Sequence, residues 1–153
     1  MLEKNIIQSI HDKHVQSFGI SAAMLRLDLL HPIVSGNKIF KLNHYLAAAK
    51  KGEKKGIITF GGPFSNHLVA AAYAAKLNNL ESVGYVRGEI PNKLSHGLMD
   101  CMAYGMQLEF MSRETFDSID FVQFSADNPN HAIIPHGGYG RLGMLGAKEI
   151  MEI

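Results

Sequence analysis

The chain has 153 residues, of which 46% are apolar and 19% charged, a balance typical of a globular domain with a buried core. Fifteen Lys and Arg stand against fourteen Asp and Glu, so a net charge of +1 supplies no general field for nucleic acid or an anionic membrane. No apolar run approaches the ~20 residues of a membrane helix, and no signal-peptide core is present. The single Cys101 excludes an internal disulfide framework and is typical of a reducing compartment. We therefore expect a soluble cytoplasmic protein that handles small molecules, with neither nucleic acid nor membrane as its partner.

The apolar pattern predicts strands that alternate with helices. In chain order, the predicted elements are a strand at 24–29, a helix at 38–51, a strand at 56–60, a helix at 68–77, a strand at 81–86, a helix at 93–104, a strand at 107–111, a weak helix at 116–124, a strand at 131–135 and a helix at 142–153. The helix at 38–51 carries one apolar stripe, formed by Leu42, Tyr45, Leu46 and Ala49. This alternation predicts an α/β fold with a mostly parallel sheet and helices on both of its faces.

Three polar, glycine-rich patches lie where open parallel sheets bind their ligands, beyond the carboxyl ends of strands. They are residues 35–42 (SGNKIFKL), 59–67 (TFGGPFSNH) and 134–143 (IPHGGYGRLG).

The first patch places Lys38 and Lys41 in the first turn of a predicted helix. The positive end of the helix dipole and the repulsion between the two ammonium groups both lower the pKa of an amine there. A lowered pKa suits a lysine that forms a Schiff base. The alternative interpretation is a pair of surface lysines on the solvated face of the helix.

The second patch ends a predicted strand and begins a helix whose N-cap is Ser65. Free backbone N–H groups at such a position bind a carboxylate or a phosphate. Ser65 adds a hydroxyl, Asn66 an amide and His67 a titratable ring. The alternative interpretation is an ordinary capped turn with solvated polar residues.

In the third patch, Gly138, Gly140 and Gly143 match the G-x-G-x-x-G fingerprint of dinucleotide-binding domains. That fingerprint also requires an acidic residue about 20 positions later, and the sequence stops before that point. Dinucleotide binding is therefore a remote alternative. The spacing of the histidines and the lone cysteine predicts no metal site.

Taken together, SGNKIFKL and TFGGPFSNH closely resemble the 1-aminocyclopropane-1-carboxylate deaminase / D-cysteine desulfhydrase family. Residues 26–30 (RLDLL) and 134–140 (IPHGGYG) support the resemblance, in the expected order, and it extends from about residue 24 to residue 153. This family belongs to the tryptophan-synthase-β-like, fold type II pyridoxal-phosphate enzymes. The resemblance implies a deaminase or lyase that uses pyridoxal 5'-phosphate to act on a small amino acid, and that forms a homo-oligomer.

The resemblance also implies roles for individual residues. Lys38 would form the Schiff base with the cofactor, and Lys41 would approach the cofactor phosphate. Asn66 would bind the phenolic oxygen of the cofactor ring. Ser65 would serve catalysis, and together with Asn66 and His67 it would receive the substrate carboxylate.

The resemblance divides the chain into three parts. Residues 1–35 would join the larger cofactor domain, residues 36–140 would form the smaller α/β domain, and residues 141–153 would begin the return to the larger domain. The last predicted helix has neither a cap nor a closing strand, so we expect a fragment or a truncated part of a larger protein. The alternative to an enzyme is accordingly a catalytically incompetent fragment or a non-catalytic α/β half-domain.

Overall fold

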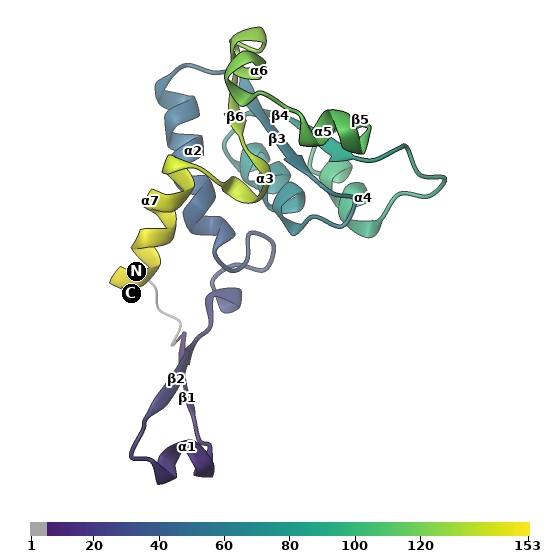
Figure 1. Cartoon of the computed structure of the whole chain (residues 1–153). Helices are drawn as coiled ribbons and strands as arrows, with labels where there is room; N and C mark the ends of the chain where they lie inside the picture. The colour runs from purple at the N-terminus through teal and green to yellow at the C-terminus, as the bar shows by residue number, and fades with distance from the viewer. Residues whose placement is uncertain (1–5) are drawn as a thin grey trace.

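A four-stranded parallel sheet forms the centre of the computed structural model, which describes residues 6–153 (Figure 1). The strand order is β5-β4-β3-β6. The strands are β3 (Gly56–Gly61), β4 (Glu81–Arg87), β5 (Met106–Met111) and β6 (His131–Ile134). Gly56 pairs with Glu81 on one side and with His131 on the other, so β3 has a neighbour on each edge and is buried throughout.

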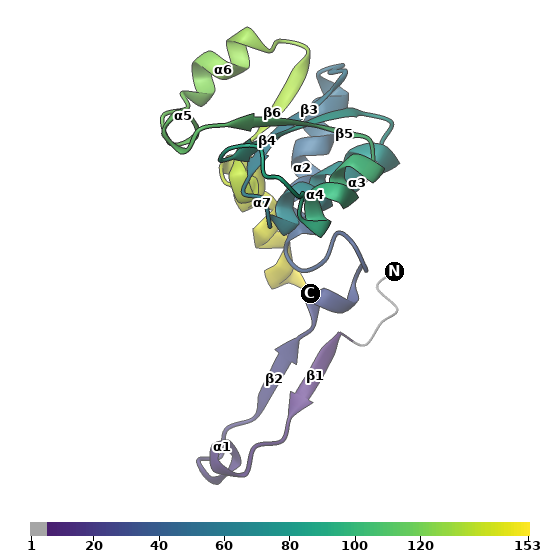
Figure 2. The same ribbon diagram turned by 90° about the vertical axis from the view of Figure 1, so that its right-hand side faces the viewer.

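Helices cover both faces of this sheet (Figure 2). One face carries α3 (Asn66–Leu77) and α4 (His96–Ala103), with α2 (Lys38–Lys51) beside α3. The other face carries α5 (Arg113–Asp117) and α6 (Phe121–Asp127). The predicted α/β class and its two helical layers are thereby confirmed.

The second face is held by an aromatic cluster around Phe60 of β3. The Phe60 ring stacks on Tyr85 of β4 with centroids 5.5 Å apart, and it meets three further rings edge-on. Those rings belong to Phe116, Phe121 and Phe124. The predicted weak helix at 116–124 is two short helices, because Asp120 begins a new one by accepting hydrogen bonds from the N–H groups of Val122 and Gln123.

On the first face, α2 begins and ends where the sequence predicted. Its four buried residues are the predicted stripe, Leu42, Tyr45, Leu46 and Ala49. Ser65 caps α3, because its Oγ accepts a hydrogen bond from the Leu68 N–H at 3.3 Å. The helix predicted at 93–104 begins only at His96, because Ser95 is its N-cap.

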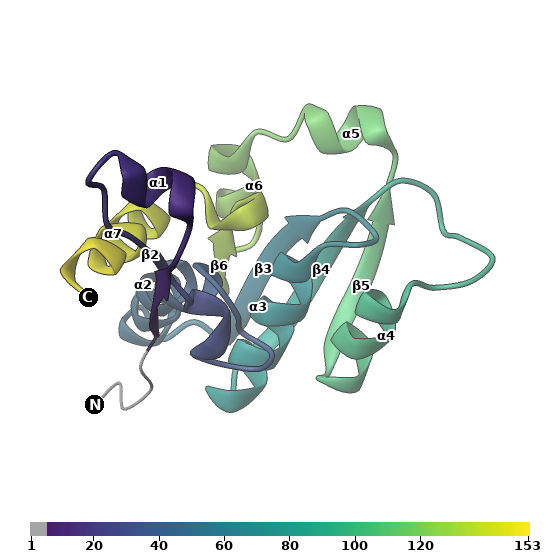
Figure 3. The same cartoon turned by 90° about the horizontal axis from the view of Figure 1, so that it is seen from below.

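The last helix, α7 (Arg141–Glu149), packs along α2, and a 3-10 turn at Ile150–Glu152 follows it (Figure 3). Two glycines of α7 allow close backbone contacts, Gly143 with the turn at His136–Gly138 and Gly146 with α2. An added Cβ at Gly143 would meet the Gly138 carbonyl oxygen at 1.8 Å, and one at Gly146 would meet the Phe40 carbonyl oxygen at 2.0 Å. His44 Nε2 and Glu149 Oε1, 2.7 Å apart, join the same two helices.

Before α2, an antiparallel hairpin of β1 (Ile7–Ile10) and β2 (Ala22–Leu25) extends away from the sheet, with α1 (Lys13–Ser17) at its tip (Figures 1 and 2). The strand predicted at 24–29 ends at Leu25, because Leu27–Leu29 form a 3-10 turn in which Asp28 pairs with Arg26 at 2.6 Å. Among residues 6–153, no helix is long and apolar enough to cross a membrane.

Candidate active site

The three predicted patches meet at the carboxyl ends of β3 and β6. The starts of α2 and α3 and the 3-10 turn η2 (His136–Gly138) contact one another. Gly138 lies at their centre. A Cβ built on it would lie 3.4 Å from Lys41 Cβ and 3.7 Å from His67 Cε1. Residues 41, 67 and 138, which come from three different patches, thus lie next to one another.

Lys38 is the first residue of α2 and is half-buried. Its Nζ donates a hydrogen bond to Asn37 Oδ1 at 2.9 Å. Burial lowers the pKa of the Lys38 amine, and the charge of Lys41 lowers it further. The direction is the one that the sequence predicted, although the largest cause is burial.

Lys41 lies one turn later, with its Nζ 4.8 Å from the centroid of the Tyr139 ring. The backbone of Tyr139 is anchored in turn, because its carbonyl oxygen accepts a hydrogen bond from the Tyr45 hydroxyl at 2.5 Å. Gly140, with φ of 115°, follows it, and a Cβ at this position would lie 2.9 Å from the Tyr45 oxygen. Tyr139 lies in the third predicted patch, but the sequence predicted no role for it; an aromatic residue between glycines was its signal in the sequence.

At the start of α3, the backbone provides free donors. Within residues 6–153, the N–H groups of Asn66 and His67 have no hydrogen-bond acceptor, while Leu68 N–H is bound to Ser65 Oγ. The Asn66 side chain is exposed, and it lines a hollow of about 340 Å³ together with Ser35 and Asp100. Free N–H groups at a helix start are what the binding of an anionic group requires, and that role of the second patch stays a prediction.

His67 differs from its neighbours, because its ring turns inward and is only 3% exposed. Its Nε2 lies 2.8 Å from Thr59 Oγ1, and that hydroxyl donates to the Ile134 carbonyl oxygen at 2.9 Å. Burial, and the charges of Lys38, His136 and Lys41, lower the pKa of His67 to about 3. The ring is therefore neutral at physiological pH. Its partner Thr59 lies in the second predicted patch, but the sequence predicted no role for it.

The glycine fingerprint at 138–143 serves packing in this structure. Gly138 is buried with φ of 68°, and Gly143 contacts its carbonyl group. These glycines therefore bring α7 onto α2 and close the turn after β6, which explains their spacing without a dinucleotide.

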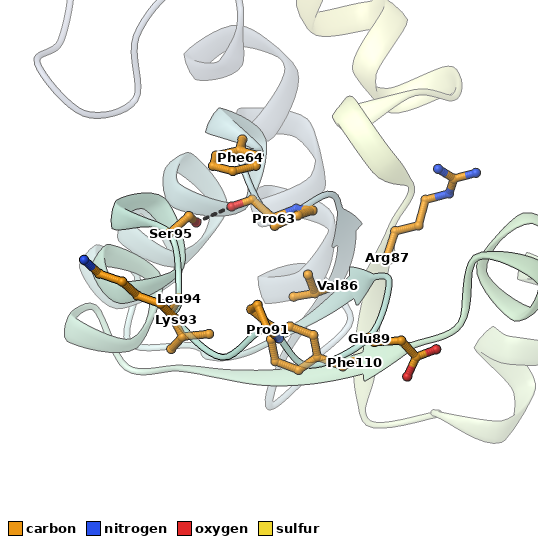
Figure 4. Close-up of a pocket in the computed structure, with 10 residues that line it drawn as sticks. All are labelled: Pro63, Phe64, Val86, Arg87, Glu89, Pro91, Lys93, Leu94, Ser95 and Phe110. Atoms are coloured by element: carbon orange, nitrogen blue, oxygen red, sulfur yellow. Dashed lines mark hydrogen bonds between the residues drawn. The ribbon is translucent and has the colours of Figure 1, made fainter.

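A separate apolar pocket of about 280 Å³ lies beyond the ends of β4 and β5 (Figure 4). Its walls include Phe64, Pro91, Leu94 and Phe110. Ser95 Oγ donates a hydrogen bond to the Pro63 carbonyl group across one rim, as Figure 4 shows. The pocket thus shares the turn at 63–64 with the start of α3. Among residues 6–153, no group of His, Cys, Asp and Glu could hold a metal ion.

Comparison with known proteins connects this geometry to one group of enzymes. No family model matches the chain. A Thermotoga maritima protein provisionally named 1-aminocyclopropane-1-carboxylate deaminase is 30% identical over 138 residues, which cover 86% of this chain and 44% of that protein. The bifunctional mitochondrial D-cysteine desulfhydrase/1-aminocyclopropane-1-carboxylate deaminase of Arabidopsis thaliana is 30% identical over 137 residues, which cover 78% of this chain and 34% of that protein. The chain thus spans less than half the length of these curated relatives.

Solved structures of other proteins superpose on the fold of this chain. The structure of an ACC deaminase homologue superposes with a TM-score of 0.71 at 24% identity, covering 95% of this chain and 47% of that one. Serine racemase from Dictyostelium discoideum superposes with a TM-score of 0.59 at 18% identity, covering 95% of this chain and 47% of that one. The resemblance inferred from the motifs is confirmed, and so is the fold type II architecture that it implied.

Proposed function

Because the chain is a homologue of proteins named 1-aminocyclopropane-1-carboxylate deaminase and D-cysteine desulfhydrase, we propose that it is the lysine-bearing part of a pyridoxal-phosphate-dependent deaminase or lyase acting on a small amino acid. The observation that carries the proposal is Lys38, a half-buried amine with a lowered pKa at the meeting point of the three patches. An unprotonated amine is what attack on an aldehyde requires.

The donor set of the site fits the cofactor. Lys38 offers the amine for the aldehyde, and Lys41 offers a cation for the phosphate, held near the Tyr139 ring. The exposed Asn66 amide offers a hydrogen bond for the phenolic oxygen of the ring. When bound, pyridoxal phosphate supplies an electron sink for the carbon from which the substrate loses a group.

The start of α3 supplies the binding energy for the substrate carboxylate in this proposal. The free N–H groups of Asn66 and His67 point from a helix N-terminus, where a negative charge is stabilised. Ser65 accepts one hydrogen bond as the cap, and its own O–H remains able to donate to the carboxylate. An orientation set by this turn presents the substrate to Lys38.

We also propose the arrangement of domains on the same basis. Residues 36–140 would form the smaller domain, and residues 1–35 and 141–153 would face the larger one. The exposed apolar side chains of the hairpin support this, among them Ile7, Phe18, Ile20 and Met24. An exposed two-stranded hairpin is marginally stable alone, so docking on another domain or subunit would stabilise it.

Covalent labelling of Lys38 by the cofactor tests the proposed function. We expect pyridoxal phosphate to become fixed to Lys38 on borohydride reduction, and peptide mapping identifies the modified lysine. Lys38→Met should lose the adduct, while Lys148→Met, which changes an exposed lysine on α7, should keep it. An adduct mapped to Lys41, or spread evenly over surface lysines, would favour the non-catalytic half-domain instead.

A further inference from the structure

One buried atom of the site lacks a partner. Among the buried side-chain nitrogens and oxygens of residues 6–153, His67 Nδ1 has no hydrogen bond. The other ring nitrogen, Nε2, has a partner. Thr59 Oγ1 donates its single hydrogen to the Ile134 carbonyl oxygen, so it must accept a hydrogen bond from His67 Nε2–H. The ring is therefore held as the Nε2–H tautomer, and its Nδ1 carries a lone pair. Buried acceptors of this kind are nearly always satisfied in proteins.

Three basic side chains are near enough to influence the His67 ring, namely Lys38, Lys41 and His136. Lys41 lies over the Tyr139 ring. His136 is exposed, and its ring lies against the same tyrosine with centroids 5.5 Å apart. Lys38 is the remaining candidate donor for His67 Nδ1. It is half-buried, and its ammonium group, on a flexible four-carbon stem, has three N–H donors, one of which is bound to Asn37 Oδ1.

We propose that His67 Nδ1 is a second hydrogen-bond acceptor for the Lys38 amine, so that His67 is a positioning residue for that lysine. The chain of contacts then runs from Ile134 of β6 through Thr59 of β3 and His67 of α3 to the amine at the start of α2. It ties the position of Lys38 to strands β3 and β6 rather than to Asn37 alone. The inference rests on the proposed function in treating Lys38 as the reactive amine.

Side-chain nitrogen NMR tests the contact directly. The His67 Nδ1 signal, assigned by its loss in His67→Gln, moves upfield when the atom accepts a hydrogen bond. We expect Lys38→Met to shift this signal downfield and Lys41→Met to leave it nearly unchanged. A signal that moves in neither variant, moves equally in both, or moves only in Lys41→Met would overturn the proposal.

Two substitutions of His67 separate positioning from simple packing. The Asn side chain reaches the place of Nδ1 but not that of Nε2, so His67→Asn keeps the acceptor toward Lys38 and loses the contact with Thr59. His67→Gln does the reverse, because its terminal amide reaches the place of Nε2. An acceptor stabilises the ammonium form of Lys38, so losing it leaves more free amine at neutral pH.

The readout is trace labelling with acetic anhydride, scored at Lys38 relative to the exposed Lys148. We expect Lys38 to be labelled several-fold faster in His67→Gln and at nearly the parental rate in His67→Asn. A change confined to His67→Asn would mean that only the Thr59 contact matters, and an equal change in both variants would mean that the substitutions act through packing alone; either result would overturn the proposal. Neither measurement uses pyridoxal phosphate, so failure of the proposed function and failure of this inference remain distinguishable.

Discussion

Gly146 of α7 lies against the Phe40 carbonyl group of α2 so closely that a Cβ on the glycine would be 2.0 Å from the oxygen. The same Cβ would lie 3.0 Å from the backbone nitrogen of Lys41. The two helices therefore touch backbone to backbone beside the turn that carries Lys38 and Lys41. Docking of α7 and the shape of the candidate site are consequently coupled.

Gly146→Ala should lower the free energy of unfolding by roughly 2 kcal/mol, because backbone atoms cannot yield as a flexible side chain can. Helix propensity alone predicts the opposite sign, a gain of up to about 1 kcal/mol. The matched control is Gly97→Ala in α4, where the nearest atom to a new Cβ is 3.4 Å away. Denaturant titration of both variants decides between the two effects, and equal stabilisation would contradict the close contact.

Lys41→Met should slow the reaction of Lys38 with pyridoxal at neutral pH by a few-fold. The Lys41 charge helps to lower the pKa of Lys38, so removing it raises that pKa and leaves less free amine. Pyridoxal without its phosphate is the probe, because Lys41 then has no phosphate to bind. Lys41→Arg keeps the charge and should react at nearly the parental rate across the pH range.

Ser65→Ala should cost about 1 kcal/mol of stability through the lost cap, and it should also lower substrate turnover with pyridoxal phosphate bound. Ser112→Ala is the matched control, because Ser112 caps α5 through the Thr115 N–H at 3.1 Å and lies outside the site. Thermal melts should show similar losses for both variants. If the turnover of folded Ser65→Ala protein matches that of Ser112→Ala, Ser65 is a cap alone.

Acid should destabilise the protein through His67. Its pKa is about 3 in the folded state, against an ordinary value of 6.5, so between these values the unfolded chain binds a proton that the folded chain does not. Stability is therefore fully present above about pH 6.5 and falls as the pH decreases toward 3, with a slope approaching about 1.4 kcal/mol per pH unit from this group.

His67→Gln should flatten that pH dependence, since glutamine has no proton to bind. His136→Gln removes an exposed histidine from the neighbouring turn and should leave the slope nearly unchanged. Urea titrations at several pH values between 4 and 7 measure the difference. A parental slope in His67→Gln would show that other groups dominate acid unfolding.

The elements that could be predicted are those whose signals are local. The helix at Lys38–Lys51 carries its apolar stripe in its own residues, and the helix at Asn66–Leu77 carries its cap. The hairpin was not predicted because β1 is a strand only through its pairing with β2, and the sequence of residues 7–10 contains no signal for that pairing. The extended strand at 24–29 was wrong beyond Leu25, where the pairing of Arg26 with Asp28 accompanies a local turn.

The residues of the candidate site also fall into those with a local signal in the sequence and those that depend on distant parts of the chain. Lys38, Lys41, Ser65 and Asn66 are visible as residue types placed at helix starts, so motif reasoning could select them. The inward rotation of His67 could not be predicted, because it depends on Thr59 and Ile134 from two different strands. Tyr139 depends equally on a helix far away in the chain, through the Tyr45 hydroxyl.

The order of the strands has a consequence for how the chain folds. β3 pairs with β4, from which it is separated by one helix. The other edge of β3 pairs with β6, which comes from much later in the chain. Closing so long a loop is entropically slow compared with pairing neighbours. The Thr59–Ile134 contact must form in that late step, so His67 gains its anchored partner only when the last strand arrives. On emergence from a ribosome, the lysine-bearing helix α2 would be made before β6, the strand on which its surroundings depend.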